Sequence, residues 1–370
     1  MKKKILVLSN FPAPYRVAVF KGIAEDYDLD VYFGYRTDDN RNKDYTVSDD
    51  GLNYTILETE EANKKFKDDI KHLKKYSMIL AYDWYLPYAL KVILKACMLG
   101  IPFAINCDGA FLYENPGIKQ RIKDVVKSFV IRSACLCFAS GEYAKRYFTY
   151  YGAKATKIVG YHFTSLEEKD IRKNLPTVHE KQKVRKELGL KERTTFIAVG
   201  QFIYRKGFDI LLEAWRDLDE NNQLVIIGGG NLEQKYHQII LEKKYKNVVI
   251  DKFKPKETVF RYYSAADVFV LPTREDIWGL VINEAMAMGL PVVCSDKCIA
   301  GLEYIENNKN GYIVSLDANE LHDKMYDLSV NPMVCLSMGK ENWSKMRECT
   351  LEKIAQNHLD SIHKVLDVRK

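Results

Sequence analysis

The sequence predicts an α/β protein with two doubly wound parallel-sheet domains. Its 370 residues exceed one ordinary core and, at about 150 residues per domain, fit two. Short apolar or β-branched runs alternate with helical patterns along most of the chain, which is typical of parallel strands covered by helices on both faces. A polar, charged stretch over residues 165–193 separates two such series.

The expected elements follow from this alternation. In the first series, strands are expected at 4–9, 29–35, 54–57, 78–82, 103–106, 135–139 and 157–159. Helical periodicity fills gaps at 16–24, 62–75, 87–98, 118–133 and 143–150. In the second series, strands are expected at 195–199, 224–227, 248–250, 268–271, 292–294 and 311–314. An amphipathic helix at 351–366 follows, so we expect domains at 1–165 and 166–345 and a terminal helical segment at 346–370.

Composition excludes several protein classes. The hydrophobic fraction of 47% and charged fraction of 29% are those of a globular chain, not of a disordered or fibrous one. No uncharged apolar run approaches the ~20 residues of a membrane span. The apolar run after Lys2-Lys3-Lys4 stops at Ser9, too short for a signal peptide, so we expect a cytoplasmic protein. The eight cysteines lack a CxxC pair and are expected to be reduced thiols, with no metal site.

Positive charge is concentrated in the first half. Residues 1–160 hold 25 lysines and arginines against 19 acidic residues, whereas residues 161–370 hold 31 of each. Residues 115–157 alone hold nine basic and two acidic residues. Within this basic region, one face of the helix expected at 118–133 carries Ile122, Val125, Val126, Phe129 and Val130. Lysines on its other faces are Lys119, Lys123 and Lys127.

Two interpretations of this helix stay open. A basic amphipathic helix attracts an anionic surface, which is lipid, a phosphorylated acceptor or nucleic acid. Nucleic acid is the weakest of these, because the chain shows no helix-turn-helix and no RNP-like aromatic run. The alternative is an ordinary solvated face over a core stripe.

The most informative motif spans residues 267–294. A strand is followed by a polar loop with Glu275 and Asp276, and a helix opens at Gly279, where unpaired N–H groups and the helix dipole favour an anion. Glu284 lies in the second turn, placed to accept hydrogen bonds from hydroxyls. A phosphate flanked by carboxylates fits a nucleotide sugar, whereas either carboxylate alone would be interpreted as a solvated surface acid.

A second motif spans residues 198–215. Gly200 follows a strand, and Arg205 and Lys206 precede a helix, where cations would stabilise a diphosphate leaving group. Alone, these residues would be interpreted as a solvated loop; in the same domain as the acidic loop, they favour a functional site. A glycine triplet centred on Gly229 also follows a strand and admits backbone contacts to a ligand, although a tight turn needs glycine anyway.

These segments resemble the retaining GT-B glycosyltransferases of family 4, over nearly the whole chain. The family's signature is Glu, seven residues, Glu, then Ala-Met-Ala-x-Gly-x-Pro-Val, and the chain has Glu284-Ala-Met-Ala-Met-Gly-Leu-Pro-Val-Val. The residue eight positions before Glu284 is Asp276 rather than Glu, with Glu275 one position earlier. The register favours Asp276 for the first acidic role, and Glu275 stays open.

The other family motifs match in part. The Gly-Arg…Lys-Gly donor motif has Gln201 in place of Arg, so the resemblance implies that Lys206 contacts the diphosphate and that Arg205 compensates. Arg16 lies in a Pro-x-x-Tyr-Arg form seen in part of the family and is expected to contact acceptor or donor phosphate. The family's histidine after a central strand is absent; Asp108 is the nearest candidate, or a turn residue in an Asp-Gly pair.

The resemblance implies a metal-independent enzyme that transfers a sugar, with retention, from a nucleoside-diphosphate sugar. The implied acceptor is a saccharide or a polyprenyl-diphosphate-linked saccharide of cell-surface polysaccharide or capsule biosynthesis. The donor would bind residues 166–345 and the acceptor residues 1–165, and the segment 346–370 would pack back onto the first domain. No cofactor is expected besides the donor substrate. Through the basic region at 115–157, peripheral association with an anionic membrane is expected.

The site residues that follow are of two kinds. The expected catalytic residues are Asp108, Arg205, Lys206 and Asp276. The expected substrate-binding residues are Arg16, Gly200, Gly229, Glu275, Trp278, Gly279, Leu280, Val281 and Glu284. Two alternatives remain: a GT-B nucleotide-sugar 2-epimerase, and a non-catalytic scaffold that kept the fold.

Overall fold

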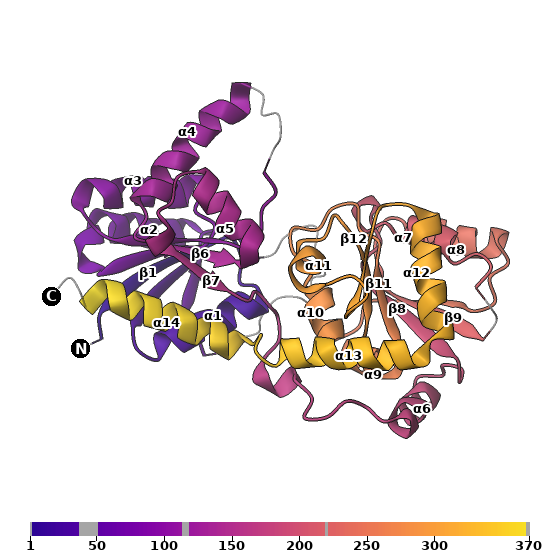
Figure 1. The fold of residues 1–370 in the computed structure, drawn as a ribbon. Helices are drawn as coiled ribbons and strands as arrows, with labels where there is room; N and C mark the ends of the chain where they lie inside the picture. Colours follow the sequence, from indigo (N-terminus) through magenta and orange to yellow (C-terminus); the bar gives the residue numbers. More distant parts are fainter. Residues whose placement is uncertain (1, 37–50, 113–117, 219–220, 368–370) are drawn as a thin grey trace. The chain divides into compact units, whose positions relative to one another are not determined.

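The computed structural model describes residues 2–36, 51–112, 118–218 and 221–367. The chain divides into two compact units, each with one parallel sheet (Figure 1). Unit 1 comprises Met1–Thr164 and Thr350–Lys370, and unit 2 comprises Ser165–Cys349. The last helix therefore belongs to the first unit, although it follows the second in sequence.

Among the described residues of unit 1, seven strands form a sheet in the order β3-β2-β1-β4-β5-β6-β7. The strands are β1 (Lys4–Ser9), β2 (Asp28–Phe33), β3 (Tyr54–Ile56), β4 (Met78–Ala81), β5 (Phe103–Cys107), β6 (Leu136–Ser140) and β7 (Ile158–Tyr161). The helices are α1 (Pro14–Ala24), α2 (Glu60–Lys71), α3 (Pro87–Leu99), α4 (Ile118–Ser133), α5 (Gly141–Tyr150) and α14 (Leu351–Asp367). The strand order reverses between β1 and β4.

The helices of unit 1 cover both faces of its sheet. Helices α2 to α5 lie on one face, and α1 and α14 lie side by side on the other (Figure 1). The pattern of α14 explains its position, since its apolar residues recur at helical spacing and are buried: Leu351, Ile354, Ala355, Leu359, Ile362 and Leu366. Helix α14 also approaches α1 so closely that a Cβ on Gly22 would touch that of Ala355.

Among the described residues of unit 2, six strands form a sheet in the order β10-β9-β8-β11-β12-β13. The strands are β8 (Thr194–Gln201), β9 (Asn222–Gly229), β10 (Val248–Asp251), β11 (Val268–Leu271), β12 (Val292–Ser295) and β13 (Gly311–Val314). The helices are α6 (Val178–Glu187), α7 (Phe208–Ala214), α8 (Glu233–Glu242), α9 (Lys256–Ala265), α10 (Leu280–Ala287), α11 (Ile299–Tyr304), α12 (Ala318–Val330) and α13 (Pro332–Met346). The strand order reverses between β8 and β11.

The α/β class and the thirteen strands predicted from the sequence are confirmed, with strand ends that agree within two residues. Helix α6 was missed, because it lies in the stretch interpreted as a separator.

The core-stripe interpretation of α4 is wrong for Val125, Val126 and Phe129, which are exposed; the side chain of Ile122 lies outside the described part. None of the described helices has both the length and the apolarity that a membrane span requires.

The loops after β8 and β11 approach each other at the backbone. Gly207 has a φ of 70°, and a Cβ at this position would overlap the carbonyl oxygen of Pro272, in the loop after β11. Glycine is therefore needed here both for its left-handed conformation and for the space it leaves.

His358 of α14 is buried against aromatic rings. It stacks on Phe138 with ring centroids 3.8 Å apart and meets Tyr161 edge-on at 5.1 Å. Its Nδ1 lies 2.8 Å from the carbonyl oxygen of Ile354, which makes Nδ1–H the donor. Within the described part of the chain, Nε2 has no hydrogen-bond partner. Burial lowers the pKa of His358 to about 3.

We predict that Gly207→Ala destabilises unit 2 by roughly 2–4 kcal/mol, because the change adds strain and steric overlap. Gly189→Ala is the matched control: Gly189 has a φ of 69°, but nothing lies within 4 Å of a Cβ there. The control should cost only about 1 kcal/mol. Urea unfolding measures both, and equal losses would contradict the close approach of the loops.

A second prediction concerns pH. Because the pKa of His358 is about 3 when folded and ordinarily 6.5, the unfolded chain binds a proton that the folded chain excludes between these values. The stability of unit 1 should therefore fall as pH falls below 6.5. Relative to His358→Phe, the wild type should lose roughly 2–3 kcal/mol between pH 7 and 4.5 in urea titrations. A difference between the two proteins that does not change with pH would contradict a buried neutral histidine.

Candidate functional site

The candidate site of unit 2 lies where its strand order reverses. In an open parallel sheet, the loops after the two strands flanking such a reversal diverge and leave a crevice for ligands. Here the loops after β8 and β11 are joined by hydrogen bonds. The backbone N–H of Arg274 donates to the carbonyl oxygen of Arg205 at 2.7 Å, and Arg205 Nη1 donates to the carbonyl oxygen of Glu275 at 2.7 Å. Two segments about 70 residues apart in sequence thus form one structure.

A buried ion pair lies at the centre of this site. Lys206 Nζ pairs with the carboxylate of Asp276, and both side chains are about nine-tenths buried. Arg205 Nη1 lies 3.6 Å from the other oxygen of Asp276. Two cations thus face one carboxylate, which leaves one net positive charge, and the second cation, Arg205, is partly exposed to water. Such a site favours a further anion.

The start of α10 adds to this preference. Gly279 is the N-cap residue, with a φ of 91°, so the first N–H groups of the helix lie three to five residues after Asp276. A Cβ on Gly279 would lie 3.6 Å from Asp276 Oδ2, which places that carboxylate beside the helix N-terminus. The helix dipole stabilises a negative charge there. Asp276 thus lies where cations and the helix dipole together favour an anion.

Glu284 lies one turn further along α10 in a separate polar cluster. Its carboxylate accepts hydrogen bonds from Ser165 Oγ at 2.9 Å and from Tyr263 OH at 3.3 Å. Burial raises the pKa of Glu284, and the charge of Lys256 works in the opposite direction. The predicted role of accepting hydroxyl donors fits this geometry, although here the hydroxyls are the chain's own.

The other predicted donor residues have varied surroundings. The side chain of Glu275 is exposed, so the geometry favours Asp276 for the first acidic role. A Cβ on Gly200 would lie 3.7 Å from Lys206 Cδ, which places this glycine beside the lysine, whereas Gly229 ends β9.

Trp278 is buried, and its Nε1 donates to Asn283, so its indole is engaged inside unit 2. Two half-buried residues of the first helical turn complete the set: Leu280 and Val281.

In unit 1, the predicted residues Arg16 and Asp108 pair with each other. The guanidinium of Arg16 is buried, contacts the Asp108 carboxylate and lies 4.5 Å from the centroid of the Tyr82 ring. Asp108 also accepts from Asn106 Nδ2 at 2.7 Å and from Tyr161 OH at 3.1 Å. Asp108 is partly buried and takes part in a hydrogen-bonded network, so it is more than a turn residue. Both a site residue and a structural residue could have these contacts.

Asp83 was not predicted, although it is a polar residue two positions after β4, at the end of an apolar run. Its carboxylate accepts from Ser9 Oγ at 2.8 Å, from the Asn10 backbone N–H at 2.9 Å and from Tyr85 OH at 3.2 Å. Burial raises the pKa of Asp83, and the nearby charge of Arg16 opposes this shift. The position of Asp83, after a strand that flanks the reversal in unit 1, was the available signal.

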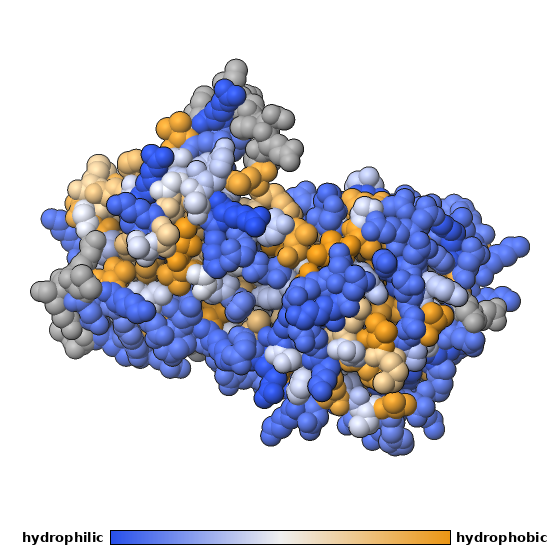
Figure 2. Space-filling model, in the orientation of Figure 1, coloured by the Kyte–Doolittle hydropathy of each residue, from blue (hydrophilic) through white to orange (hydrophobic). Residues whose placement is uncertain are grey.

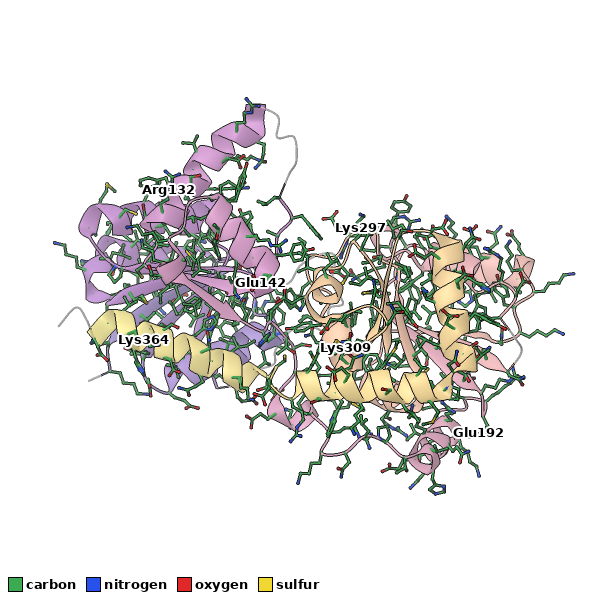
Figure 3. The ribbon with its side chains drawn as sticks, in the orientation of Figure 1. Arg132, Glu142, Glu192, Lys297, Lys309 and Lys364 are labelled. Carbon is green, nitrogen blue, oxygen red and sulfur yellow. The ribbon has the colours of Figure 1, made fainter. Side chains whose placement is uncertain are left out.

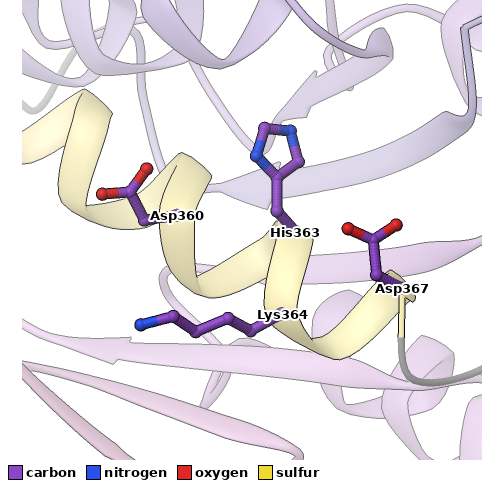
Figure 4. A pocket seen from close by; sticks show the side chains of 4 residues that line it. All are labelled: Asp360, His363, Lys364 and Asp367. Carbon is purple, nitrogen blue, oxygen red and sulfur yellow. The ribbon is translucent and has the colours of Figure 1, made fainter.

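Two further features lie apart from these clusters. Within the described ranges, no three His, Cys, Asp or Glu side chains are grouped so as to hold a metal ion. An open depression along α14 is lined by Asp360, His363, Lys364 and Asp367 (Figure 4). His363 Nε2 lies 3.1 Å from Asp26 Oδ2. None of the residues that line the depression belongs to either polar cluster.

Comparison with known proteins relates this geometry to a family. Residues 180–343 match the family described as glycosyl transferases group 1. An uncharacterized glycosyltransferase of Haemophilus influenzae is 30% identical over 171 residues, which cover 45% of this chain and 48% of that protein. The amylovoran biosynthesis glycosyltransferase AmsK of Erwinia amylovora is 34% identical over 128 residues, 32% of this chain and 31% of that protein. The matches thus span about half of the first relative and a third of the second.

The fold comparison covers nearly the whole chain. The crystal structure of Anabaena Alr3699/HepE in complex with UDP matches with a TM-score of 0.76 and 16% identity, over 98% of this chain and 100% of that one. The chain therefore has the two-domain GT-B fold, and the Lys206–Asp276 site lies within the segment that matches the glycosyl transferases group 1.

Proposed function

We propose that this protein is a retaining, metal-independent glycosyltransferase that uses a nucleoside-diphosphate sugar. The observation that carries the proposal is the gathering of Lys206, Arg205 and the α10 N-terminus where the strand order of unit 2 reverses. These groups suit the two negative charges of a diphosphate. The match of residues 180–343 to the glycosyl transferases group 1 supports the same function.

In this proposal, the diphosphate binds between Lys206 and the first turn of α10, and Glu284 accepts hydrogen bonds from the ribose. Asp276, released from Lys206, accepts from hydroxyls of the transferred sugar. The bond between the anomeric carbon and the phosphate oxygen breaks while the acceptor oxygen bonds to the same face of that carbon. The acceptor proton passes to the leaving diphosphate. The chain contributes position and positive charge, which count most as charge grows on the diphosphate.

The proposed acceptor is a saccharide or a polyprenyl-diphosphate-linked saccharide, bound by unit 1. The support is chemical: at the carboxyl ends of β1, β4 and β5, the buried Arg16 pairs with the partly buried Asp108, and its charge acts on the buried Asp83. Carboxylates are suitable acceptors for the hydroxyls of a sugar. The biosynthesis of amylovoran by the relative AmsK supports surface-polysaccharide assembly as the setting.

We predict that Lys206→Ala weakens UDP binding, measured by calorimetry, by roughly 10- to 100-fold, because a buried charge-assisted contact is lost. Lys191→Ala is the matched control, since Lys191 is exposed before the amino end of β8, and it should bind like the wild type. GDP and ADP are tested in parallel to identify the base. Equal affinity of the Lys206 and Lys191 variants for every nucleotide bound would contradict the site.

Asp276→Asn separates binding from transfer. Because Asp276 neutralises Lys206 in the free protein, its removal should leave UDP affinity equal or higher, while transfer to an acceptor falls at least 100-fold. Turnover is followed by release of the nucleoside diphosphate with a mixture of lipid-linked and free saccharides. An epimerised nucleotide sugar without any acceptor would instead indicate a 2-epimerase. Binding without turnover on any substrate would indicate a scaffold.

A further inference from the structure

Helix α4 exposes an apolar strip. The exposed fractions are 71% for Val125, 42% for Val126 and 50% for Phe129, and Val125 and Phe129 lie one turn apart on the same side. Towards the C-terminal end of the helix, Val130 and Ile131 are buried in the core. The other part of α4 extends beyond the layer formed by the neighbouring helices of unit 1 (Figure 1).

Basic residues border this strip. Arg121 precedes Val125 by one turn, and Arg132 follows Phe129 by three residues, so both lie near the apolar side. Lys123 is also exposed. Lys127 is 3.6 Å from Asp124, but no ion pair joins Arg121, Lys123 or Arg132 to an acid of the described chain. We call Arg121, Lys123, Val125, Val126, Phe129 and Arg132 the α4 surface.

Apolar and basic side chains lie close together on and around the α4 surface. In the space-filling view, apolar and strongly hydrophilic side chains lie next to each other on α4 (Figure 2). Arg132 is at the end of the helix nearer the sheet (Figure 3). Two more exposed apolar residues, Phe111 and Leu112, precede the helix in sequence. The basic excess of residues 115–157, nine against two, gives the region a positive field; the side chain of Lys119 lies outside the described part.

Charge decides between the possible occupants. A second copy of the chain would bring like charges together across a symmetric contact, which is unfavourable. Nucleic acid would pair with the arginines, but its phosphate backbone gives no partner for Val125 and Phe129. An anionic bilayer satisfies both parts of the surface, because its headgroups attract cations while apolar side chains enter the boundary with the acyl chains.

We propose that the α4 surface binds an anionic lipid bilayer, with Val125 and Phe129 inserted at the headgroup boundary and Arg121 and Lys123 on the phosphates. This inference goes beyond the proposed transfer reaction, because it needs neither donor nor acceptor. Unit 1 would be held at the membrane by α4.

The test is co-sedimentation of the full chain with vesicles of phosphatidylcholine, with or without 25% phosphatidylglycerol. The wild type should bind the anionic vesicles and lose binding in 0.5 M salt. The double variant Val125→Gln/Phe129→Gln should bind at least tenfold more weakly. Arg121→Gln/Lys123→Gln should bind roughly 25-fold more weakly, since each charge near an anionic surface is worth about fivefold.

The matched control is Leu241→Gln/Lys243→Gln at the end of α8, where Leu241 is 76% exposed. It should bind vesicles like the wild type, and thermal unfolding should show that all variants are folded. Equal wild-type binding to both vesicle types, no binding to either, or unchanged binding by the α4 variants would overturn the proposal. Self-association abolished by Phe129→Gln would overturn it too, in favour of an interface between copies. UDP binding is measured separately, so failure here leaves the proposed reaction standing.

Discussion

The buried contact between Lys206 and Asp276 is the interaction on which the site of unit 2 depends. Removing two charges from water costs several kcal/mol per ion, and their mutual attraction offsets this only when geometry and additional polar contacts are good. Both conditions are met, because the loops after β8 and β11 are hydrogen-bonded together and Gly207 lets them meet at the backbone. The result is a preformed site with one more cation than carboxylates.

The two units share the same type of sheet topology, but the polar clusters at their strand-order reversals have opposite net charges. Each sheet reverses its strand order beside its first strand, and each gathers polar residues there. In unit 1, Asp83 and Asp108 share one cation, Arg16, whereas in unit 2 Lys206 and Arg205 share one carboxylate. This contrast is consistent with a hydroxyl-rich acceptor at unit 1 and a diphosphate at unit 2.

The sequence predicted the fold well, because buried parallel strands leave continuous apolar runs and helices leave a 3.6-residue period. It also located the motif at residues 267–294, which contains Asp276 and Glu284. It could not show that Lys206 pairs with Asp276 or Arg16 with Asp108, since loops 70 or 92 residues apart meet only through the strand order. Periodicity gave α4 the correct bounds but not its exposure, which depends on how far the helix extends beyond its neighbours. His358 was missed because a histidine within an apolar stripe resembles any other core position.

A structure of the protein with a bound nucleoside diphosphate would show whether the site around Lys206 and Asp276 holds the diphosphate. The proposed donor site predicts that the phosphates contact Lys206 Nζ and the first backbone N–H groups of α10, that Asp276 has moved off the lysine, and that the ribose hydroxyls face Glu284. A nucleotide bound at any other place, with the contact between Lys206 and Asp276 unchanged, would contradict it.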